Sequence, residues 1–218
     1  MTRRTLLSSV VASFYTGSAK AATAKPPNVV MFMTDDHGAW ALGSYGCREM
    51  HTPNIDALAS GGARFTNAFA ATPVCSPSRM TWITGKMPSQ HGVQDWLVPN
   101  DSFGPKARRW QDGHNTYSES LAAAGYTLGM VGKWHMGHDD KPQAGFSYWA
   151  TIPGGGGPYK DVDILKNGTT VRSPYKTDTF GDIAVDFIGQ QRKDKPFYLL
   201  MPFYAPHTPF DYQPETYR

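Results

Sequence analysis

The sequence has no run of about 20 consecutive apolar residues, so it predicts no membrane-spanning helix. It also has little net charge once its first 24 residues are set aside. Those residues contain Arg3, Arg4 and Lys20 but no acidic residue, and the rest of the chain has 18 basic and 18 acidic side chains. A neutral chain gives no reason to expect binding to nucleic acid or to an anionic membrane surface. Internal repeats and low-complexity tracts are also missing.

Cysteine is scarce. The chain of 218 residues contains only Cys47 and Cys75, which allow at most one disulfide. Its hydrophobic content of 40% and charged content of 18% are typical of a globular protein, and the length is sufficient for one domain with a sizeable core.

The first 24 residues resemble a cleavable secretory signal. A cationic start at Arg3 and Arg4 precedes a modest apolar stretch and small residues around Ala21 and Ala24. Residues 2–7 also resemble a twin-arginine export signal, and the weak hydrophobicity that follows fits that route. We therefore expect a periplasmic or secreted protein whose mature chain begins near residue 25. The alternative is a disordered tail.

The remainder alternates between strand and helix patterns, which predicts an α/β fold with a mostly parallel sheet and helices on both faces. The evidence is hydrophobic periodicity together with Pro, Gly and capping signals at element ends. We expect strands at 28–34, 64–69, 126–131 and 197–203, and helices at 52–61, 75–85, 116–124 and 180–188. The first strand is apolar throughout, as in a strand buried on both faces. The glycine-rich stretch 153–159 is expected to be a surface loop near the cleft.

Ligands of such sheets bind beyond the carboxyl ends of the strands. Polar residues of suitable chemistry follow four of the predicted strands. They are Asp35, Asp36, Cys75, Lys133, His135 and His207. The sequence therefore predicts that these side chains converge on one site.

Cys75 is expected at the N-terminus of a helix, where free N–H groups favour an anion. Pro77 suits the first turn, Ser76 or Ser78 can cap it, and Gly85 ends it. Arg79, one turn after Cys75, is expected to point back toward it as a donor to oxyanions. The bland alternative is a buried structural thiol beside a helix cap.

The segment Cys75–Arg79 resembles the sulfatase signature Cys-x-Pro-x-Arg. Thr34-Asp35-Asp36, the run 132–137 and the run 204–209 resemble further motifs of the same family, in the same order, and the resemblance extends from about Pro27 to the end. It implies a type I, formylglycine-dependent sulfatase with an alkaline-phosphatase-like fold, closest in appearance to bacterial carbohydrate sulfatases. The implied activity is hydrolysis of sulfuric esters.

The resemblance also implies roles for the site residues. A maturation enzyme would convert Cys75 to formylglycine, whose hydrate attacks sulfur while Lys133 and Arg79 neutralise the oxyanions. His135 would take a proton from the second hydroxyl so that sulfate is expelled, and His207 would hold the sulfate and protonate the leaving oxygen. Cys75 is then unavailable for a disulfide, which leaves Cys47 as a lone thiol.

Two adjacent carboxylates, Asp35 and Asp36, would repel each other unless a cation lies between them, and oxygen ligands suit calcium or magnesium. The resemblance favours calcium, with Asp35, Asp36 and the modified Cys75 as ligands. A capping pair at a helix is the alternative. Family members supply a later Asp, Asn and Lys, which would fall beyond Arg218. We therefore expect 25–218 to be the N-terminal part of a sulfatase catalytic domain, truncated before those ligands.

Residues 148–154, 166–168 and 177–178 look like the corresponding stretch of bacterial sulfatases that act on sulfated carbohydrates, although a run of glycines replaces the usual Gly-Gln-Gly. A sulfated carbohydrate or small molecule is therefore the expected substrate. Trp134 and Trp149 are expected in the core or cleft wall rather than as sugar platforms. Two other functions remain open: a phosphonate or phosphate monoester hydrolase of the same superfamily, and a non-catalytic fragment that binds anions.

Overall fold

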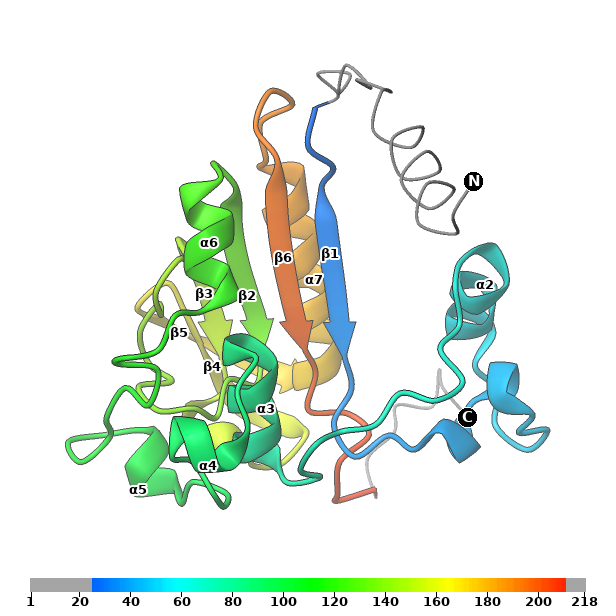
Figure 1. The fold of residues 1–218 in the computed structure, drawn as a ribbon, viewed down its shortest axis with the longest axis horizontal. Helices are drawn as coiled ribbons and strands as arrows, with labels where there is room; N and C mark the ends of the chain where they lie inside the picture. Colours follow the sequence, from blue (N-terminus) through cyan, green and yellow to red (C-terminus); the bar gives the residue numbers. More distant parts are fainter. Residues whose placement is uncertain (1–24, 211–218) are drawn as a thin grey trace, which may run out of the picture.

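A computed structural model describes residues 25–210 of the chain. The fold is a mixed sheet with helices on both faces (Figure 1). The strands are β1 Val29–Met33, β2 Thr127–Gly132, β3 Tyr148–Thr151, β4 Lys160–Lys166, β5 Thr169–Tyr175 and β6 Phe197–Pro202. The α-helices are α2 Pro53–Gly61, α3 Cys75–Thr84, α4 Pro88–His91, α5 Pro99–Ser102, α6 Tyr117–Ala123 and α7 Lys176–Gly189, and short 3₁₀ helices are η1 Ala39–Ala41, η2 Gly43–Tyr45 and η3 Pro153–Gly155.

The sheet has six strands within the described residues, in the order β1-β6-β2-β3-β4-β5. The first four are mutually parallel, whereas β4 and β5 form an antiparallel hairpin at one side. The prediction of an α/β, mostly parallel sheet is therefore confirmed. The hairpin was not predicted, because charged residues interrupt its apolar pattern.

Alternation along the central strands divides the core into two layers. On β6, Phe197, Leu199 and Met201 pack toward α7, and Tyr198 and Leu200 pack toward α3 and α6 on the other face (Figure 1). Within the described residues, no helix is long and apolar enough to cross a membrane.

The predicted helices at Cys75 and Thr116 are confirmed. Helix α3 begins at Cys75 and ends at Thr84, and its C-cap residue Gly85 has a left-handed φ of 68°. Helix α6 begins with the expected capping box, in which the Thr116 side chain accepts from the Glu119 N–H while the Glu119 side chain accepts from the Thr116 N–H. Capping of α3 by Ser76 or Ser78 was wrong: Val74 is the N-cap residue, without a side-chain bond.

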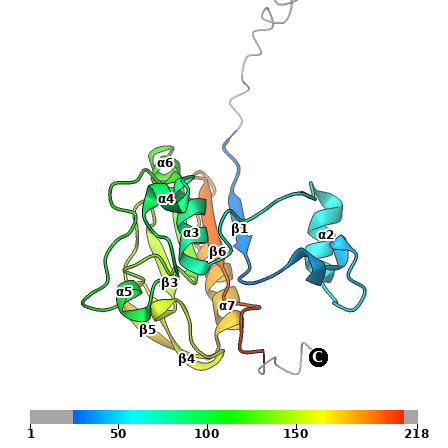
Figure 2. The same cartoon turned by 60° about the horizontal axis from the view of Figure 1, so that its bottom comes forward.

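The predicted strand at 64–69 is wrong. This segment is a loop in which Phe65 and Phe69 are largely exposed. It belongs to an excursion that carries α2 away from the sheet on the β1 side (Figure 2), so no neighbouring strand edge is available for pairing. Alternating residues alone cannot form a strand without that partner.

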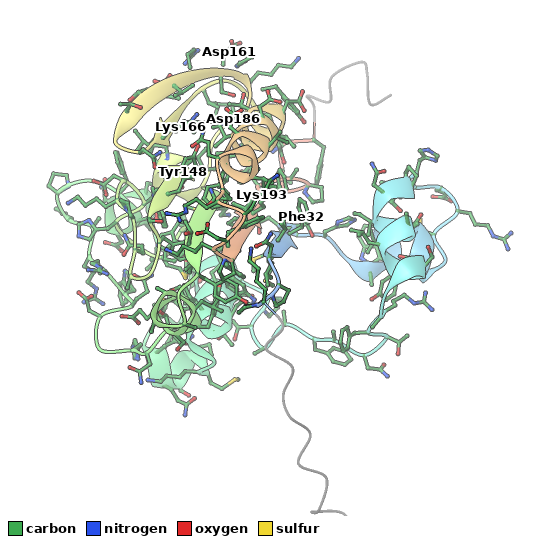
Figure 3. All side chains as sticks on the ribbon, turned by 90° about the horizontal axis from the view of Figure 1, so that it is seen from above. Phe32, Tyr148, Asp161, Lys166, Asp186 and Lys193 are labelled. Atoms are coloured by element: carbon green, nitrogen blue, oxygen red, sulfur yellow. The ribbon has the colours of Figure 1, made fainter. Side chains whose placement is uncertain are left out.

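The first strand is correctly predicted, but its burial is not. Strand β1 lies at the edge of the described sheet, with its Val30 and Phe32 side chains exposed. The Phe32 ring stacks on Phe203, with centroids 6.2 Å apart, on the side from which the α2 segment extends (Figure 3). Helix α7 covers β2 to β5 rather than β1, and this leaves one face of the edge strand open.

We predict that Phe187→Ala lowers the free energy of unfolding by about 3–5 kcal/mol, because its buried ring packs on Tyr148, Phe197 and the backbone of Gly129. Val185, exposed on the same helix, is the matched control, and its replacement by Ala should change the value by no more than about 0.5 kcal/mol. Urea denaturation measures both. Equal effects would contradict the assignment of Phe187 to the core.

Candidate active site

The carboxyl ends of the parallel strands carry the candidate residues. Asp35 follows β1, Lys133 follows β2 directly, and His207 follows β6. The N-terminus of α3 brings Cys75 to the same end of the sheet, which comes forward in Figure 2. The structure brings these segments together at one end of the sheet, and several of their side chains are in contact.

The buried carboxylate of Asp35 is the centre of the site. Its Oδ2 accepts a hydrogen bond from Lys133 Nζ at 2.6 Å and lies 3.5 Å from an Arg79 guanidinium nitrogen. All three side chains are less than a tenth exposed. The Asp35 carboxylate thus has two cationic side chains as partners. The cluster has a net positive charge, which favours an anionic ligand.

Arg79 was expected to point back toward Cys75, but its guanidinium contacts Asp35 and the backbone of Lys133. Its guanidinium donates to the Lys133 carbonyl at 2.6 Å as well as pairing with Asp35, and so connects α3 to the ends of β1 and β2. Burial lowers the pKa of Arg79, while the charge of Asp35 opposes that shift. The side chain stays charged because its ordinary pKa is very high.

The Cys75 thiol lies within this cluster. Lys133 Nζ donates to Sγ at 3.3 Å, and Sγ lies 3.8 Å from Asp35 Oδ1. Both cysteines are free in the structure, as expected for Cys47. The ammonium and the helix N-terminus place positive charge beside position 75, where a reacting oxyanion would be stabilised.

His135 is held by an unexpected partner. Its Nε2 lies 2.8 Å from the Leu97 carbonyl, and the Leu97 N–H in turn donates to Ser76 Oγ on α3. Because a carbonyl only accepts, Nε2 carries the proton, and the buried Nδ1, which has no partner among the described residues, is the acceptor. Burial, with a contribution from Lys133, lowers the pKa of His135 to about 4.

His207 also lies close to Cys75, with ligand atoms of the two residues within 4.8 Å of each other. Its ring stacks on Tyr204 with centroids 4.5 Å apart, and Nε2 lies 3.6 Å from Asp36 Oδ2. The backbone carbonyl of His207 accepts a hydrogen bond from the Tyr159 hydroxyl at 2.6 Å. His207 Nδ1 donates to the Thr208 carbonyl at 2.7 Å, so the ring is oriented by stacking and by this hydrogen bond.

A cavity of about 460 Å³, called the Cys75 cavity below, opens between these side chains. Its lining comprises Asp36, Pro73, Val74, Cys75, Trp96, Pro99, Lys133, His135, Gly154, Gly155, Gly156, Tyr204 and His207. The glycine loop thus lies at the cleft, as predicted. A side chain at Gly155 would place its Cβ 2.2 Å from the His135 ring, so only glycine permits this approach.

The carboxylates of Asp35 and Asp36 fit a hard divalent cation, whereas the Cys75 thiol and the His207 imidazole suit a softer one. Asp35, Cys75 and His207 each offer one ligand atom, and the three atoms lie within 4.8 Å of one another. Asp36 is not in this cluster: its carboxylate is more exposed and faces His207, although it lines the same cavity. The set inferred from sequence, Asp35, Asp36 and Cys75, therefore differs from the geometric cluster in one member.

The sequence reasoning missed three residues at this site: Trp96, Tyr159 and Lys176. Trp96 lies at the cavity wall with about half of its surface exposed. Lys176 offered a usable signal, because it precedes Phe180 by four residues and so falls on the apolar stripe of α7. A lysine at such a position is buried only when it has particular partners.

The Sulfatase family model matches residues 27–218. This chain belongs to the sulfatase family. It is 35% identical over 186 residues to N-acetylglucosamine-6-O-sulfatase of Bacteroides thetaiotaomicron, covering 84% of this chain and 31% of that protein. It is 30% identical over 224 residues to human N-acetylgalactosamine-6-sulfatase, covering 88% of this chain and 42% of that protein. The sulfatase therefore spans less than half the length of these relatives.

A solved structure also supports the family and the fold. This sulfatase matches a protein in complex with its substrate D-glucosamine-2-N,6-O-disulfate, with a TM-score of 0.71 and 33% identity, covering 84% of this chain and 35% of that one. The alkaline-phosphatase-like fold expected from the motifs is confirmed. The matched family range also agrees with the resemblance, which began at about Pro27.

We predict that the His135 ring titrates near pH 4 in the folded chain and at about pH 6.5 in the chain unfolded by urea. Because the folded pKa is depressed, the neutral ring contributes to stability above about pH 6.5, and this contribution is lost as the pH falls toward 4. A ¹H–¹⁵N NMR titration of the ring nitrogens measures this, with His135→Gln to identify the signals. A folded-state midpoint at or above 6.5 would contradict it.

Proposed function

We propose that this sulfatase hydrolyses sulfate esters of carbohydrates through a formylglycine derived from Cys75 and a bound divalent cation. The observation that carries the proposal is the position of Cys75: its Sγ lies beside Lys133 Nζ, within a buried cluster that has one more positive charge than negative. Such a cluster suits a nucleophile that attacks an anionic ester.

The formylglycine and the divalent cation would make distinct contributions. Hydrated formylglycine at position 75 supplies a hydroxyl nucleophile that can later eliminate, and the cation supplies a Lewis acid for oxyanions. Asp35, Asp36 and the modified residue 75 would hold the cation. Calcium is favoured over magnesium, because it tolerates irregular oxygen ligand sets, whereas magnesium demands near-octahedral geometry.

The chain's own residues bind the sulfate and move protons. Lys133 faces position 75 and neutralises a sulfate oxygen there, while Arg79 fixes Asp35 and the Lys133 backbone. His135 is neutral at neutral pH, so its Nδ1 can accept a proton within the cavity. His207 also lines the cavity and is the donor to the leaving oxygen.

A carbohydrate substrate is supported by the relatives and by one side chain. The relatives' names specify sulfate on amino sugars, and one solved relative contains D-glucosamine-2-N,6-O-disulfate. Trp96 presents an exposed aromatic surface to the Cys75 cavity, suited to the apolar face of a sugar ring. Trp134 and Trp149 are fully buried, in accord with the expectation that they are not platforms.

Export and maturation are part of the same proposal. Residues 1–24, which lie outside the described residues, would be the secretory and possibly twin-arginine signal, and the mature enzyme would be periplasmic or secreted. A formylglycine-generating enzyme would act on Cys75 before the chain folds. The catalytic domain would begin at residue 25.

The proposal predicts activity in protein expressed together with such a maturation enzyme. Peptide mass spectrometry should find formylglycine at position 75, and the protein should hydrolyse N-acetylglucosamine 6-sulfate and 4-nitrophenyl sulfate faster than 4-nitrophenyl phosphate. Cys75→Ala should abolish turnover, because no other group can act as the nucleophile. Faster phosphate turnover would indicate a phosphate monoester hydrolase instead. Sulfate binding without any turnover would indicate a non-catalytic anion-binding protein.

A second prediction concerns the cation. Asp36→Asn should weaken calcium binding by roughly tenfold, equivalent to about 1.4 kcal/mol, because it removes a charged oxygen at the cavity wall. Isothermal titration calorimetry measures the affinity. The control is Asp161→Asn, because Asp161 is an exposed aspartate on β4 that does not line the cavity (Figure 3). Equal calcium affinities in the two variants would remove Asp36 from the ligand set.

A further inference from the structure

Lys176 is a buried lysine that the proposed chemistry does not use. It is the first residue of α7, and its side chain is inaccessible to solvent. Its N–H donates to the Tyr159 carbonyl at 2.9 Å, which fixes the start of the helix against the segment after the glycine loop. Its position on the apolar stripe would ordinarily belong to a hydrophobic residue.

Three groups contact the Lys176 ammonium. Nζ donates to the Gly157 carbonyl at 2.8 Å. It also lies 3.4 Å from the centroid of the Tyr204 ring and 4.6 Å from that of Tyr159, so both rings are in cation–π contact. Burial lowers the pKa of Lys176 to about 7, with Lys133 contributing in the same direction. The Gly157 carbonyl requires a donor and the two rings favour a cation, so these contacts partly oppose the effect of burial.

Both tyrosines lead to His207. The Tyr159 hydroxyl donates to the His207 carbonyl at 2.6 Å, and the Tyr204 ring stacks on the His207 ring with an interplanar angle of 29°. The Tyr204 hydroxyl donates to the next carbonyl, that of Thr208, at 2.8 Å. Lys176 is therefore connected to His207 by two separate routes, one through the backbone and one through the ring.

The third contact leads to another part of the wall of the Cys75 cavity. The Gly157 carbonyl belongs to the glycine loop whose residues 154–156 line the cavity. Gly155 in that loop lies directly against the His135 ring. One ammonium thus connects the loop beside His135 with the segment that carries His207.

We propose that Lys176 is a positioning residue that fixes His207 and the glycine loop relative to each other across the Cys75 cavity. It does not touch substrate: it acts through Tyr159, Tyr204 and Gly157. Methionine would fill a similar volume but would supply neither a donor nor a cation, whereas arginine would supply both. This inference does not depend on which ester the enzyme cleaves, nor on whether Cys75 is modified.

The experiment follows the His207 ring by ¹H–¹³C NMR in the labelled 218-residue chain, with His207→Gln to identify its signals. In Lys176→Met we expect the ring C–H signals to move downfield, because loss of the stacked arrangement removes the shielding by Tyr204. Lys176→Arg should retain most of the original shift. Lys193→Met is the matched control, because Lys193 is exposed on the loop after α7 (Figure 3). In this variant the His207 ring signals should have the same shifts as in the parent chain.

Tyr159→Phe is measured in the same series, because it removes only the hydroxyl bond to His207 and leaves the buried lysine in place. We expect a smaller movement of the same signals. In catalytically active protein, Lys176→Met should lower kcat/KM by roughly 10- to 100-fold, as loss of supporting residues typically does, and Lys193→Met should not. Unchanged His207 signals in either folded variant, Lys176→Met or Tyr159→Phe, would overturn the proposal and leave Lys176 a structural residue only.

Discussion

The site depends on one interaction, the buried Asp35 carboxylate with its two cations. Asp35 comes from the end of β1, Lys133 from the end of β2, and Arg79 from α3, so three elements distant in sequence are joined at one atom group. Removing one member of a buried ion cluster typically costs about 3–5 kcal/mol, because the remaining charges lose their compensation. The position of α3, and hence of Cys75, therefore depends on the ion pairs that Arg79 and Lys133 make with Asp35.

The same balance determines what the site can bind. One carboxylate between two cations leaves an excess of positive charge in a nearly dry environment, which favours an anion beside Cys75. That excess also helps to keep His135 neutral, since an imidazolium would add a third cation. Asp36 remains outside the cluster and more exposed, where its carboxylate is free to approach a metal ion or His207.

Features of the structure could be predicted from the sequence where nearby residues determine them, and not where contacts between distant segments do. The helix at Cys75, the capping box at Thr116 and the convergence of strand ends follow from local patterns and from the geometry of parallel sheets. The false strand at 64–69 and the exposed face of β1 depend on which neighbours lie alongside, and a sequence pattern does not contain that information. The contacts of His135 with Leu97 and of Lys176 with Tyr204 are non-local in the same way.

Burial within α3 also constrains when Cys75 can be modified. In the folded chain Ser76, Pro77 and Arg79 are buried, and their backbone is helical, so the signature is not accessible as an extended segment. Arg79 can join Asp35 and Lys133 only after α3 has formed and docked on the strand ends. An enzyme that reads the signature as an extended segment would therefore have to act before this cluster assembles. The interaction that organises the site thus also fixes the stage of folding at which the signature stops being an extended segment.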